Sequence, residues 1–316
     1  MFSVALNLHD HNTYDGTTHI QVERFSRIKK NLYPTASIDF YQKEFHPRFL
    51  SVDEPLAFTY TAGAIKKIKN PFQVFEKDIH DYNQSVSHLW DYMQNDRFYY
   101  INHHQSHAAY SFLSSGFSES DILAIDGGGI DYCCMFFTKD GKVINLSNEL
   151  QLGWLWNYTC LVTNLKTTAS GKLMGLVGYG KFDPVIYNAY ELLLEEAATN
   201  GKFYKRYDIL KGKKEDIACT LQQFTLDKIK EYIFPLKTCE NICLSGGVTY
   251  NGYMNEYFTT HYNNVFVPPA VGDEGQAVGT YMHADYMLNQ TIHVPSVYAG
   301  KEYDLEDNEI DYHAIA

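Results

Sequence analysis

The stretch His-His-Gln-Ser-His at residues 103–107 begins the segment HHQSHAAYSFLSSGF, whose apolar spacing is typical of a helix. His103 and His107 are four residues apart, so a helix places them on one face. Two imidazoles held in this way supply half of a tetrahedral or octahedral metal site. A helix N-terminus with ordinary histidines is the alternative, because the chain contains 13 histidines. Two distant carboxylates favour the metal: Asp126 in LAIDGGG and Asp273 in VGDEG.

Length and composition indicate a globular protein of about two domains. The chain has 316 residues, of which 45% are hydrophobic and 20% charged, and this is enough to bury a core. Its net charge of -12 argues against a nonspecific nucleic-acid binder, which needs clustered Lys and Arg. No apolar stretch reaches the roughly 18 residues of a membrane span, and the start lacks the basic region of a signal peptide. The six cysteines form no C-x-x-C pair, so we expect reduced thiols in the cytoplasm.

The N-terminal part of the chain predicts two strands followed by helices. The segment SVALNL is a short strand that runs into His9 and Asp10, and the sequence alternates again from His19. Asp10 then lies in a loop where a ligand can meet it, with an ordinary turn aspartate as the alternative. Residues 51–70 and 76–95 have the pattern of helices, and FYYINHH is a β-rich run that leads into the histidine helix.

The second half of the chain repeats this order from about Ser118. The segment DILAIDGGGIDYCCMFFTKDGKVINL predicts a strand, an Asp-Gly-rich turn and a hairpin. Two such units, each followed by helices, indicate an internal duplication that gives two α/β lobes with a cleft between them. Gly127 and Gly128 let backbone N–H groups approach an anion closely, although a tight hairpin turn explains them as well.

A glycine-rich segment at residues 170–180, SGKLMGLVGYG, is a candidate for phosphate binding. Gly171 and Lys172 resemble the end of a Walker A motif, but that motif needs glycine where this chain has Lys166. Four glycines and one lysine suit a loop pressed against a phosphate. A turn punctuated by glycines is the alternative.

The segment NICLSGGVTYNGYMNEYF predicts a buried strand, a glycine turn and the start of a helix. This context places the backbone N–H groups of Ser245, Gly246 and Gly247 beside the positive end of a helix, which is an anion site. Asn251 is expected either at the same pocket or as a plain N-terminal helix residue.

Taken together, the motifs of the chain resemble those of one family. HHQSHAAYSF, AIDGGG, SGKLMGLVGYG, LSGGVTYN and PPAVGDEGQAVGTY occur in the order and approximate spacing of the O-carbamoyltransferases that modify nodulation factors, aminoglycosides and cephem antibiotics. VERFSRIKK and the acidic tail VYAGKEYDLEDNEID are similar to further elements of that family, so the resemblance covers almost the whole chain.

The resemblance implies a fold and a metal. The fold is the two-lobed α/β fold of actin and Hsp70, a duplicated ribonuclease H-like fold shared with the tRNA threonylcarbamoyl transferases, with the metal and nucleotide cleft between the lobes. The metal, usually iron, is held by two histidines and two aspartates, which correspond to His103, His107, Asp126 and Asp273. Zinc or manganese also suits these ligands.

The repeat that starts near Ser118 also divides the chain. Residues 1–117 form the first lobe, residues 118–290 the second, and residues 291–316 an acidic, linker-like tail. Full-length members continue into a YrdC-like domain that makes carbamoyl-adenylate, and this sequence contains no such domain. It departs from the family pattern at residues 11–13, where His-Asn-Thr replaces small residues after His9-Asp10.

The expected function is O-carbamoyl transfer from carbamoyl-adenylate, formed with ATP, to a hydroxyl of a small-molecule acceptor. The glycine segments 171–180 and 245–247 would cradle the adenylate phosphate with Lys172. His104 would act as a general base, or else is a structural histidine of the helix. A YrdC-like adenylating domain or subunit is the expected partner. The alternatives are a tRNA threonylcarbamoyl transferase-like enzyme and a non-catalytic nucleotide- or sugar-binding module of the same fold.

Overall fold

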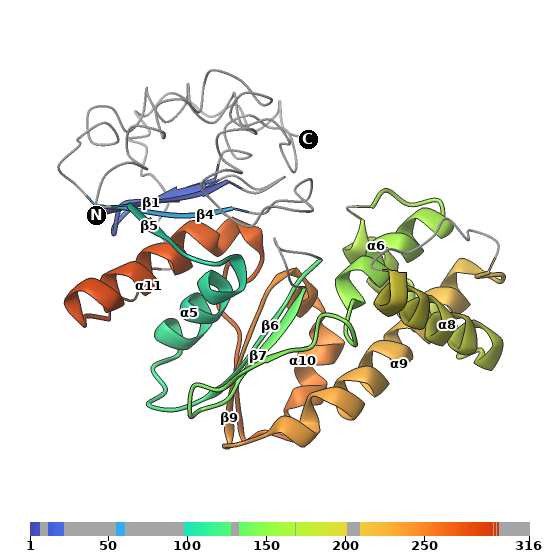
Figure 1. Cartoon of the computed structure of the whole chain (residues 1–316). Coiled ribbons are helices and arrows are strands. Elements are labelled where there is room, and N and C mark those ends of the chain that lie inside the picture. Colours follow the sequence, from blue (N-terminus) through green and yellow to red (C-terminus); the bar gives the residue numbers. More distant parts are fainter. Residues whose placement is uncertain are drawn as a thin grey trace, which may run out of the picture.

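The computed structural model of the chain describes residues 1–6, 12–21, 55–60, 98–127, 133–167, 169–200, 209–292, 294 and 296. Within these residues the chain forms two sheets with helices between and beside them (Figure 1). None of the described helices is long and apolar enough to cross a membrane.

The first sheet comes from the N-terminal part of the chain. Its described strands are β1 (Phe2–Leu6), β2 (Asn12–Tyr14), β3 (His19–Gln21), β4 (Leu56–Tyr60) and β5 (Phe98–Tyr100). Their order is β3-β2-β1-β4-β5. Strands β1, β2 and β3 form an antiparallel meander, whereas β4 and β5 run parallel to β1.

The second sheet has the same topology. Its described strands are β6 (Asp121–Ile125), β7 (Cys134–Phe137), β8 (Val143–Asn145), β9 (Asn241–Ser245) and β10 (Asn264–Phe266), in the order β10-β9-β6-β7-β8. Strands β6, β7 and β8 are antiparallel, and β9 and β10 run parallel to β6. The left-handed φ of 79° at Gly141 closes the predicted hairpin between β7 and β8. The internal duplication predicted from the sequence is therefore confirmed.

Two helices fill the space between the sheets (Figure 1). Helix α5 (His103–Ser115) packs against β6 and β9 of the second sheet, and helix α11 (Gln276–Asn289) packs against β1 and β4 of the first. The side chain of Asn102 caps α5 by accepting a hydrogen bond of 2.9 Å from the N–H of His104. Gly116, with a left-handed φ of 73°, ends it. The helix predicted around the histidines is confirmed.

Small residues let α5 and α11 approach each other closely. A Cβ atom on Gly279 would overlap the carbonyl oxygen of Ser106, so only glycine fits at this crossing. The hydroxyl of Ser106 donates a hydrogen bond of 2.8 Å to the carbonyl of Gln276. This contact fixes the N-terminal turn of α5 against the N-terminal turn of α11.

Five further described helices lie beside the second sheet on the side away from α5 (Figure 1). They are α6 (Leu152–Val162), α7 (Ser170–Gly175), α8 (Pro184–Asn200), α9 (Lys214–Tyr232) and α10 (Gly252–Phe258), with α6, α7 and α8 packed against α9. Their apolar faces share one core with the sheet, in which Phe136 of β7, Tyr190 of α8 and Phe224 of α9 are fully buried. This core holds β6 and β9 rigidly, and the candidate site lies where those strands end.

Two sequence predictions are wrong in the described residues. Residues 51–70 were expected to be helical, but Leu56–Tyr60 is strand β4. Its pairing with β1 and β5 satisfies the backbone, and its aromatic and β-branched residues suit a strand. The glycine loop expected at residues 171–180 is instead α7 followed by a 3-10 turn, η3 (Val177–Tyr179). The helix predicted at residues 76–95 lies outside the described residues.

The described strands before residue 117 belong to the first sheet and those after it to the second, in line with the predicted lobe boundary. The helices do not follow this boundary, because α5 packs mainly on the second sheet and α11 returns to the first. The division into domains therefore stays a prediction, and the tail after residue 296 lies outside the described residues.

Candidate metal centre

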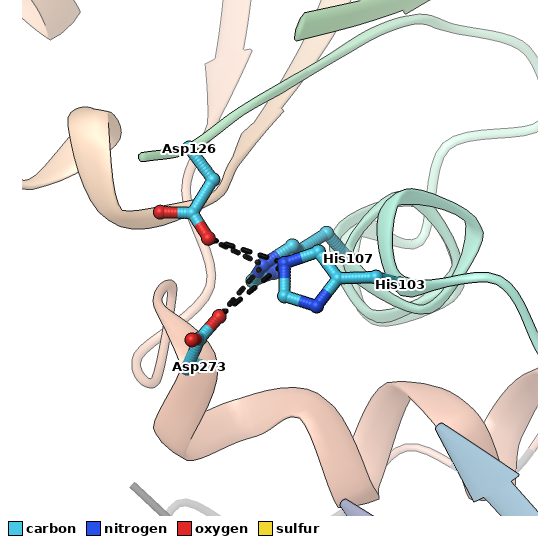
Figure 2. Close-up of side chains that lie close together, drawn as sticks. All are labelled: His103, His107, Asp126 and Asp273. Carbon is cyan, nitrogen blue, oxygen red and sulfur yellow. Dashed lines mark hydrogen bonds and ion pairs between the residues drawn. The ribbon is translucent and has the colours of Figure 1, made fainter. Parts of the chain in front are cut away.

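Four side chains predicted to bind a metal meet between the two sheets (Figure 2). His103 and His107 come from the first turns of α5, and Asp126 directly follows β6. Asp273 begins the 3-10 turn η6 (Asp273–Gly275), which leads into α11. Each offers one ligand atom, and these four atoms lie within 4.8 Å of one another. The structure thus brings together residues that are far apart in the sequence, since Asp273 lies 170 positions after His103.

The distances inside the cluster suit a shared ion. His103 Nε2 lies 3.1 Å from Asp126 Oδ2 and 3.4 Å from Asp273 Oδ1. His107 Nε2 lies 3.7 Å and 3.4 Å from the same two oxygens. Neighbouring ligands at about 2.0–2.2 Å from one metal ion are about 2.8–3.6 Å apart in octahedral or tetrahedral geometry. Only the shortest of the four distances is within the usual hydrogen-bond range of about 2.7–3.2 Å.

The chemistry of the cluster also fits a divalent cation. Both histidines are almost completely buried, and Asp273 is 7% exposed. Two imidazole nitrogens and two carboxylate oxygens form a ligand set that accommodates iron, zinc or manganese. Carboxylates buried without a cation or a protonated partner would be strongly unfavourable. A network of buried His–Asp ion pairs satisfies the same electrostatic requirement when no metal is bound.

The pKa values describe how the metal-free cluster compensates its charges. Burial opposes a charge on His107, but contacts with Asp126 and Asp273 outweigh it and raise the pKa of His107 to about 9. Burial alone would raise the pKa of Asp126, yet hydrogen bonding to His103 and His107 holds it well below its usual range. The carboxylate of Asp126 is therefore ionised at neutral pH, and His107 carries the balancing proton that a metal ion would replace.

The position of Asp273 depends on a residue of the first sheet. Asn12, in β2, donates a hydrogen bond of 2.8 Å from its side-chain amide to the carbonyl oxygen of Asp273. Its side-chain oxygen accepts one of 2.8 Å from the N–H of Ala277 in α11. Asn12 belongs to the polar segment at which the sequence departs from the family pattern. Its amide secures the turn that carries Asp273.

The position of Asp126 depends on the turn after β9. The backbone N–H of Gly247 donates a hydrogen bond of 3.1 Å to Asp126 Oδ1, and that of Gly246 donates one of 2.8 Å to the carbonyl of Val271. Both N–H groups expected to bind a phosphate thus donate hydrogen bonds inside the protein in this structure, and their assignment to a phosphate stays a prediction. The hydroxyl of Ser245 is buried and has no hydrogen-bond partner among the described residues.

Asn251 has the structural role that the sequence left as an alternative. Its side chain caps α10 by accepting a hydrogen bond of 3.1 Å from the N–H of Met254, and it donates one of 2.8 Å to Gln222. Because both ends of the amide are engaged and the residue is buried, Asn251 is not available to a ligand in this structure.

Helix α7, which contains Gly171 and Lys172, lies near Gly127, the residue that follows Asp126. Its first residue, Ser170, contacts the side chain of Asn157 in α6 at 3.3 Å. The side-chain nitrogen of Asn157 lies 3.5 Å from where a Cβ of Gly127 would be. Lys172 is exposed. The assignment of Gly127, Gly171 and Lys172 to a nucleotide stays a prediction, while Asp10 and Gly128 lie outside the described residues.

His104 is in a poor environment for a general base. It is 1% exposed, and its ring packs 5.1 Å from that of His103. Burial, together with the neighbouring His103 and His107, lowers the pKa of His104 to about 3. An acceptor hydroxyl needs direct access and a base whose pKa lies near the working pH. The structure therefore favours the alternative that His104 is a structural residue of α5.

Several residues that support the cluster were not identified from the sequence. Gly153 at the start of α6 is one, because a Cβ there would come within 2.6 Å of the backbone of Asp126 and Gly127. Tyr250 and Glu274 are two more, since the Tyr250 hydroxyl donates a hydrogen bond to a carboxylate oxygen of Glu274. The signal for Glu274 was its place next to Asp273, whereas nothing in the local sequence distinguishes Tyr250 from the other 25 tyrosines of the 26 in the chain.

The fold and the cluster together define a two-lobed α/β protein with a candidate metal centre between the lobes. A family model described as the carbamoyltransferase N-terminus matches residues 73–282. The chain therefore belongs to the carbamoyltransferase family, as its motifs indicated.

Curated relatives are similar to more than half of the chain. The chain is 24% identical to an uncharacterized protein of Synechocystis, over 92% of this chain and 58% of the relative. It is 26% identical to nodulation protein NolO of Bradyrhizobium diazoefficiens, over 64% of this chain and 42% of that protein. The chain thus spans about half the length of the curated relatives it matches.

The activator of 2-hydroxyisocaproyl-CoA dehydratase from Clostridium difficile, solved with bound ADPNP, has a similar fold. The two share a TM-score of 0.52 at 11% identity, over 92% of this chain and 96% of that one. This likeness concerns the fold alone, which is the duplicated, two-lobed fold of the actin and Hsp70 type expected from the sequence.

Proposed function

We propose that this chain transfers a carbamoyl group from carbamoyl-adenylate to a hydroxyl of a small-molecule acceptor, using a divalent metal bound by His103, His107, Asp126 and Asp273. The acceptor oxygen forms a bond to the carbamoyl carbon, the bond from that carbon to the adenylate phosphate oxygen breaks, AMP leaves, and the hydroxyl proton is released to solvent. Membership of the carbamoyltransferase family supports the reaction class. The single observation that supports the site is the convergence of these four ligand atoms within 4.8 Å between the two sheets.

The four residues suit the chemistry that the reaction requires. A bound ion, for which we favour iron over zinc or manganese, would act as a Lewis acid toward the carbamoyl oxygen. The two carboxylates balance the two charges of the cation, so the centre as a whole is neutral and is suited to a neutral carbonyl group. Rigid elements hold the ligands at the ends of α5, β6 and η6, so little reorganisation is needed on binding.

A nucleotide site beside the cluster completes the proposal. The solved protein of similar fold holds ADPNP, which supports binding of ATP or carbamoyl-adenylate by this chain. We place the nucleotide near the turn after Asp126, where Gly127, Asn157 and Ser170 adjoin one another. Lys172, exposed in α7, would be the cation that meets the phosphate.

The length of the relatives bears on the source of the adenylate, and the net charge of the chain bears on the kind of acceptor. The relatives are about twice as long as the matched region, which supports an adenylating YrdC-like domain or subunit as the partner. The net charge of -12 supports a small-molecule acceptor over a nucleic acid.

The experiment supplies the metal-loaded chain with carbamoyl-adenylate and a panel of polyhydroxylated acceptors, and detects carbamoylated products by mass spectrometry. Asp126→Ala, which removes one proposed ligand, should lose both metal content and transfer. Gly252→Ala is a matched control, because a Cβ at Gly252 would contact nothing within 4 Å. Equal transfer by the unchanged protein and Asp126→Ala would contradict the proposal.

A further inference from the structure

Next to the cluster lies a pair of residues that the proposed reaction does not use. The hydroxyl of Tyr250, the last residue of the 3-10 turn η5 (Gly247–Tyr250), donates a hydrogen bond to Oε1 of Glu274. The same carboxylate oxygen accepts a hydrogen bond of 3.0 Å from the backbone N–H of Gly272. Gly272 directly precedes Asp273 and Glu274 directly follows it. The two hydrogen bonds therefore hold the residues on both sides of this proposed metal ligand.

The ring of Tyr250 also touches the segment that it bonds. A Cβ on Gly272 would lie 3.1 Å from Cε2 of this ring, so glycine at 272 permits the tyrosine to lie against the backbone. The ring is nevertheless 56% exposed. Its contribution to the hydrophobic core is therefore small, and its contacts include Gly272 and Glu274 on either side of Asp273.

The short segment from Gly246 to Tyr250 reaches both carboxylates of the cluster. At one end, Gly246 and Gly247 bond to Val271 and to Oδ1 of Asp126. At the other end, Tyr250 bonds to Glu274 beside Asp273. One turn of chain therefore connects the strand end that carries Asp126 with the turn that carries Asp273.

We propose that Tyr250 is a positioning residue of the metal centre: its bond to Glu274 holds Asp273 at the separation from Asp126 that one shared ion requires. This inference rests on the proposed function, because it assumes that the cluster binds a metal. Outer residues that hydrogen-bond near metal ligands typically change metal affinity by about 10- to 100-fold when they are removed.

Tyr250 is easier to test by mutation than Asn12, the other residue that holds Asp273 in place. Asn12 is fully buried and bonds to both the Asp273 carbonyl and α11, so its replacement would disturb the packing of the two halves. Tyr250 is half-exposed, and Tyr250→Phe removes only the hydroxyl. The metal-free fold should therefore be unaffected, while the spacing of the ligands changes.

The experiment titrates the metal-free full chain with Co²⁺ and follows binding by calorimetry and by the visible spectrum of the bound ion. Tyr250→Phe should bind Co²⁺ about tenfold more weakly and alter the spectrum. Tyr253→Phe is the matched control, because Tyr253 is also an exposed tyrosine, at 47%, three residues further on. It should bind like the unchanged protein, and the thermal midpoint of both metal-free variants should not move.

A double-mutant comparison isolates the proposed bond. Glu274→Ala alone should weaken Co²⁺ binding, and adding Tyr250→Phe to it should weaken binding little further, since the bond is already lost. Fully additive effects would overturn the inference. So would unchanged affinity of Tyr250→Phe, or a fall in affinity matched by a fall in the thermal midpoint of the metal-free protein.

Asp273→Ala separates this inference from the proposed function. If Asp273→Ala loses Co²⁺ binding and Tyr250→Phe does not, the metal centre stands and the positioning role is wrong. If Asp273→Ala binds Co²⁺ as tightly as the unchanged protein, the metal centre itself is wrong, and the role of Tyr250 falls with it.

Discussion

The backbone N–H of Gly247 donates a hydrogen bond of 3.1 Å to Oδ1 of Asp126, and the other oxygen, Oδ2, faces the two histidines. The two oxygens of one carboxylate thus have separate partners. A backbone N–H group that is already directed at one oxygen fixes the rotation of the carboxylate, so Oδ2 keeps its direction without an ion. This arrangement is the preorganisation that a tight metal site requires.

Gly247→Ala should weaken metal binding by about 10- to 100-fold. The new Cβ would lie 2.8 Å from Asp126 Oδ1, which is too close, so the carboxylate must turn away from the cluster. Equilibrium dialysis with metal analysis measures the effect. Gly252→Ala, whose Cβ would meet open space five residues later, should bind metal normally. Equal affinity of the two variants would show that Gly247 does not orient the carboxylate.

The features of the fold that the sequence predicted are those determined by neighbouring residues. The hairpin at Asp140-Gly141, the helix from His103 and the strand before Asp126 follow from turn chemistry and from local apolar patterns. The repeated order of such elements was enough to indicate the duplication. Strand β4 was missed because it is defined by parallel pairing with β1 and β5, which are distant in the sequence.

In the candidate site, too, the sequence predicted some features and not others. The four cluster residues were identified by residue type and by motif, but the contacts that hold them in place join very distant residues. Gly247 and Asp126 are 121 positions apart, and Asn12 and Asp273 are 261 apart. The glycines of the 245–247 turn did indicate an N–H group aimed at an anion. In the structure the N–H group of Gly247 is directed at the carboxylate of Asp126, a contact that only the coordinates show.

Metal binding should release about one proton per ion at pH 7. In the metal-free protein the pKa of His107 is raised to about 9, so this imidazole is protonated at neutral pH and must lose its proton to bind an ion. Affinity should rise by about tenfold for each pH unit up to about 9 and then level off. Calorimetry in buffers with different ionisation enthalpies counts the released protons. No dependence on the buffer would contradict the charge assigned to His107.

The stability of the metal-free protein should depend on the same group. Because the pKa of folded His107, about 9, lies above its ordinary value of 6.5, the charge stabilises the fold fully below about pH 6.5. This contribution is lost as the pH rises through about 9. The difference in free energy of unfolding between the unchanged protein and His107→Gln, measured in urea, should therefore shrink from pH 6 to pH 9.5. A difference that grows over this range would contradict the sign.

Gly279→Ala should destabilise the fold by about 1–3 kcal/mol, because the added methyl group overlaps the carbonyl of Ser106 where α5 and α11 cross. The better helix propensity of alanine offsets at most about 1 kcal/mol of this cost. Urea unfolding measures the change. Gly175→Ala, in α7, is the control: its Cβ would contact nothing within 4 Å, so this variant should be at least as stable as the unchanged protein. Equal stability of both variants would mean that the two helices separate readily.

The last prediction concerns the division of the reaction between this chain and its proposed partner. The family model described as the carbamoyltransferase N-terminus matches residues 73–282, and the chain spans about half the length of its curated relatives, so we assign it the transfer half of the proposed reaction. We therefore expect the purified 316-residue chain, given metal, carbamoyl phosphate, ATP and acceptors, to release no pyrophosphate. Adding a YrdC-like adenylating domain from a full-length relative should start pyrophosphate release, and carbamoylated product should then depend on Asp126 and Asp273 of this chain. Robust pyrophosphate release without the added domain would show that residues of this chain carry out adenylation as well.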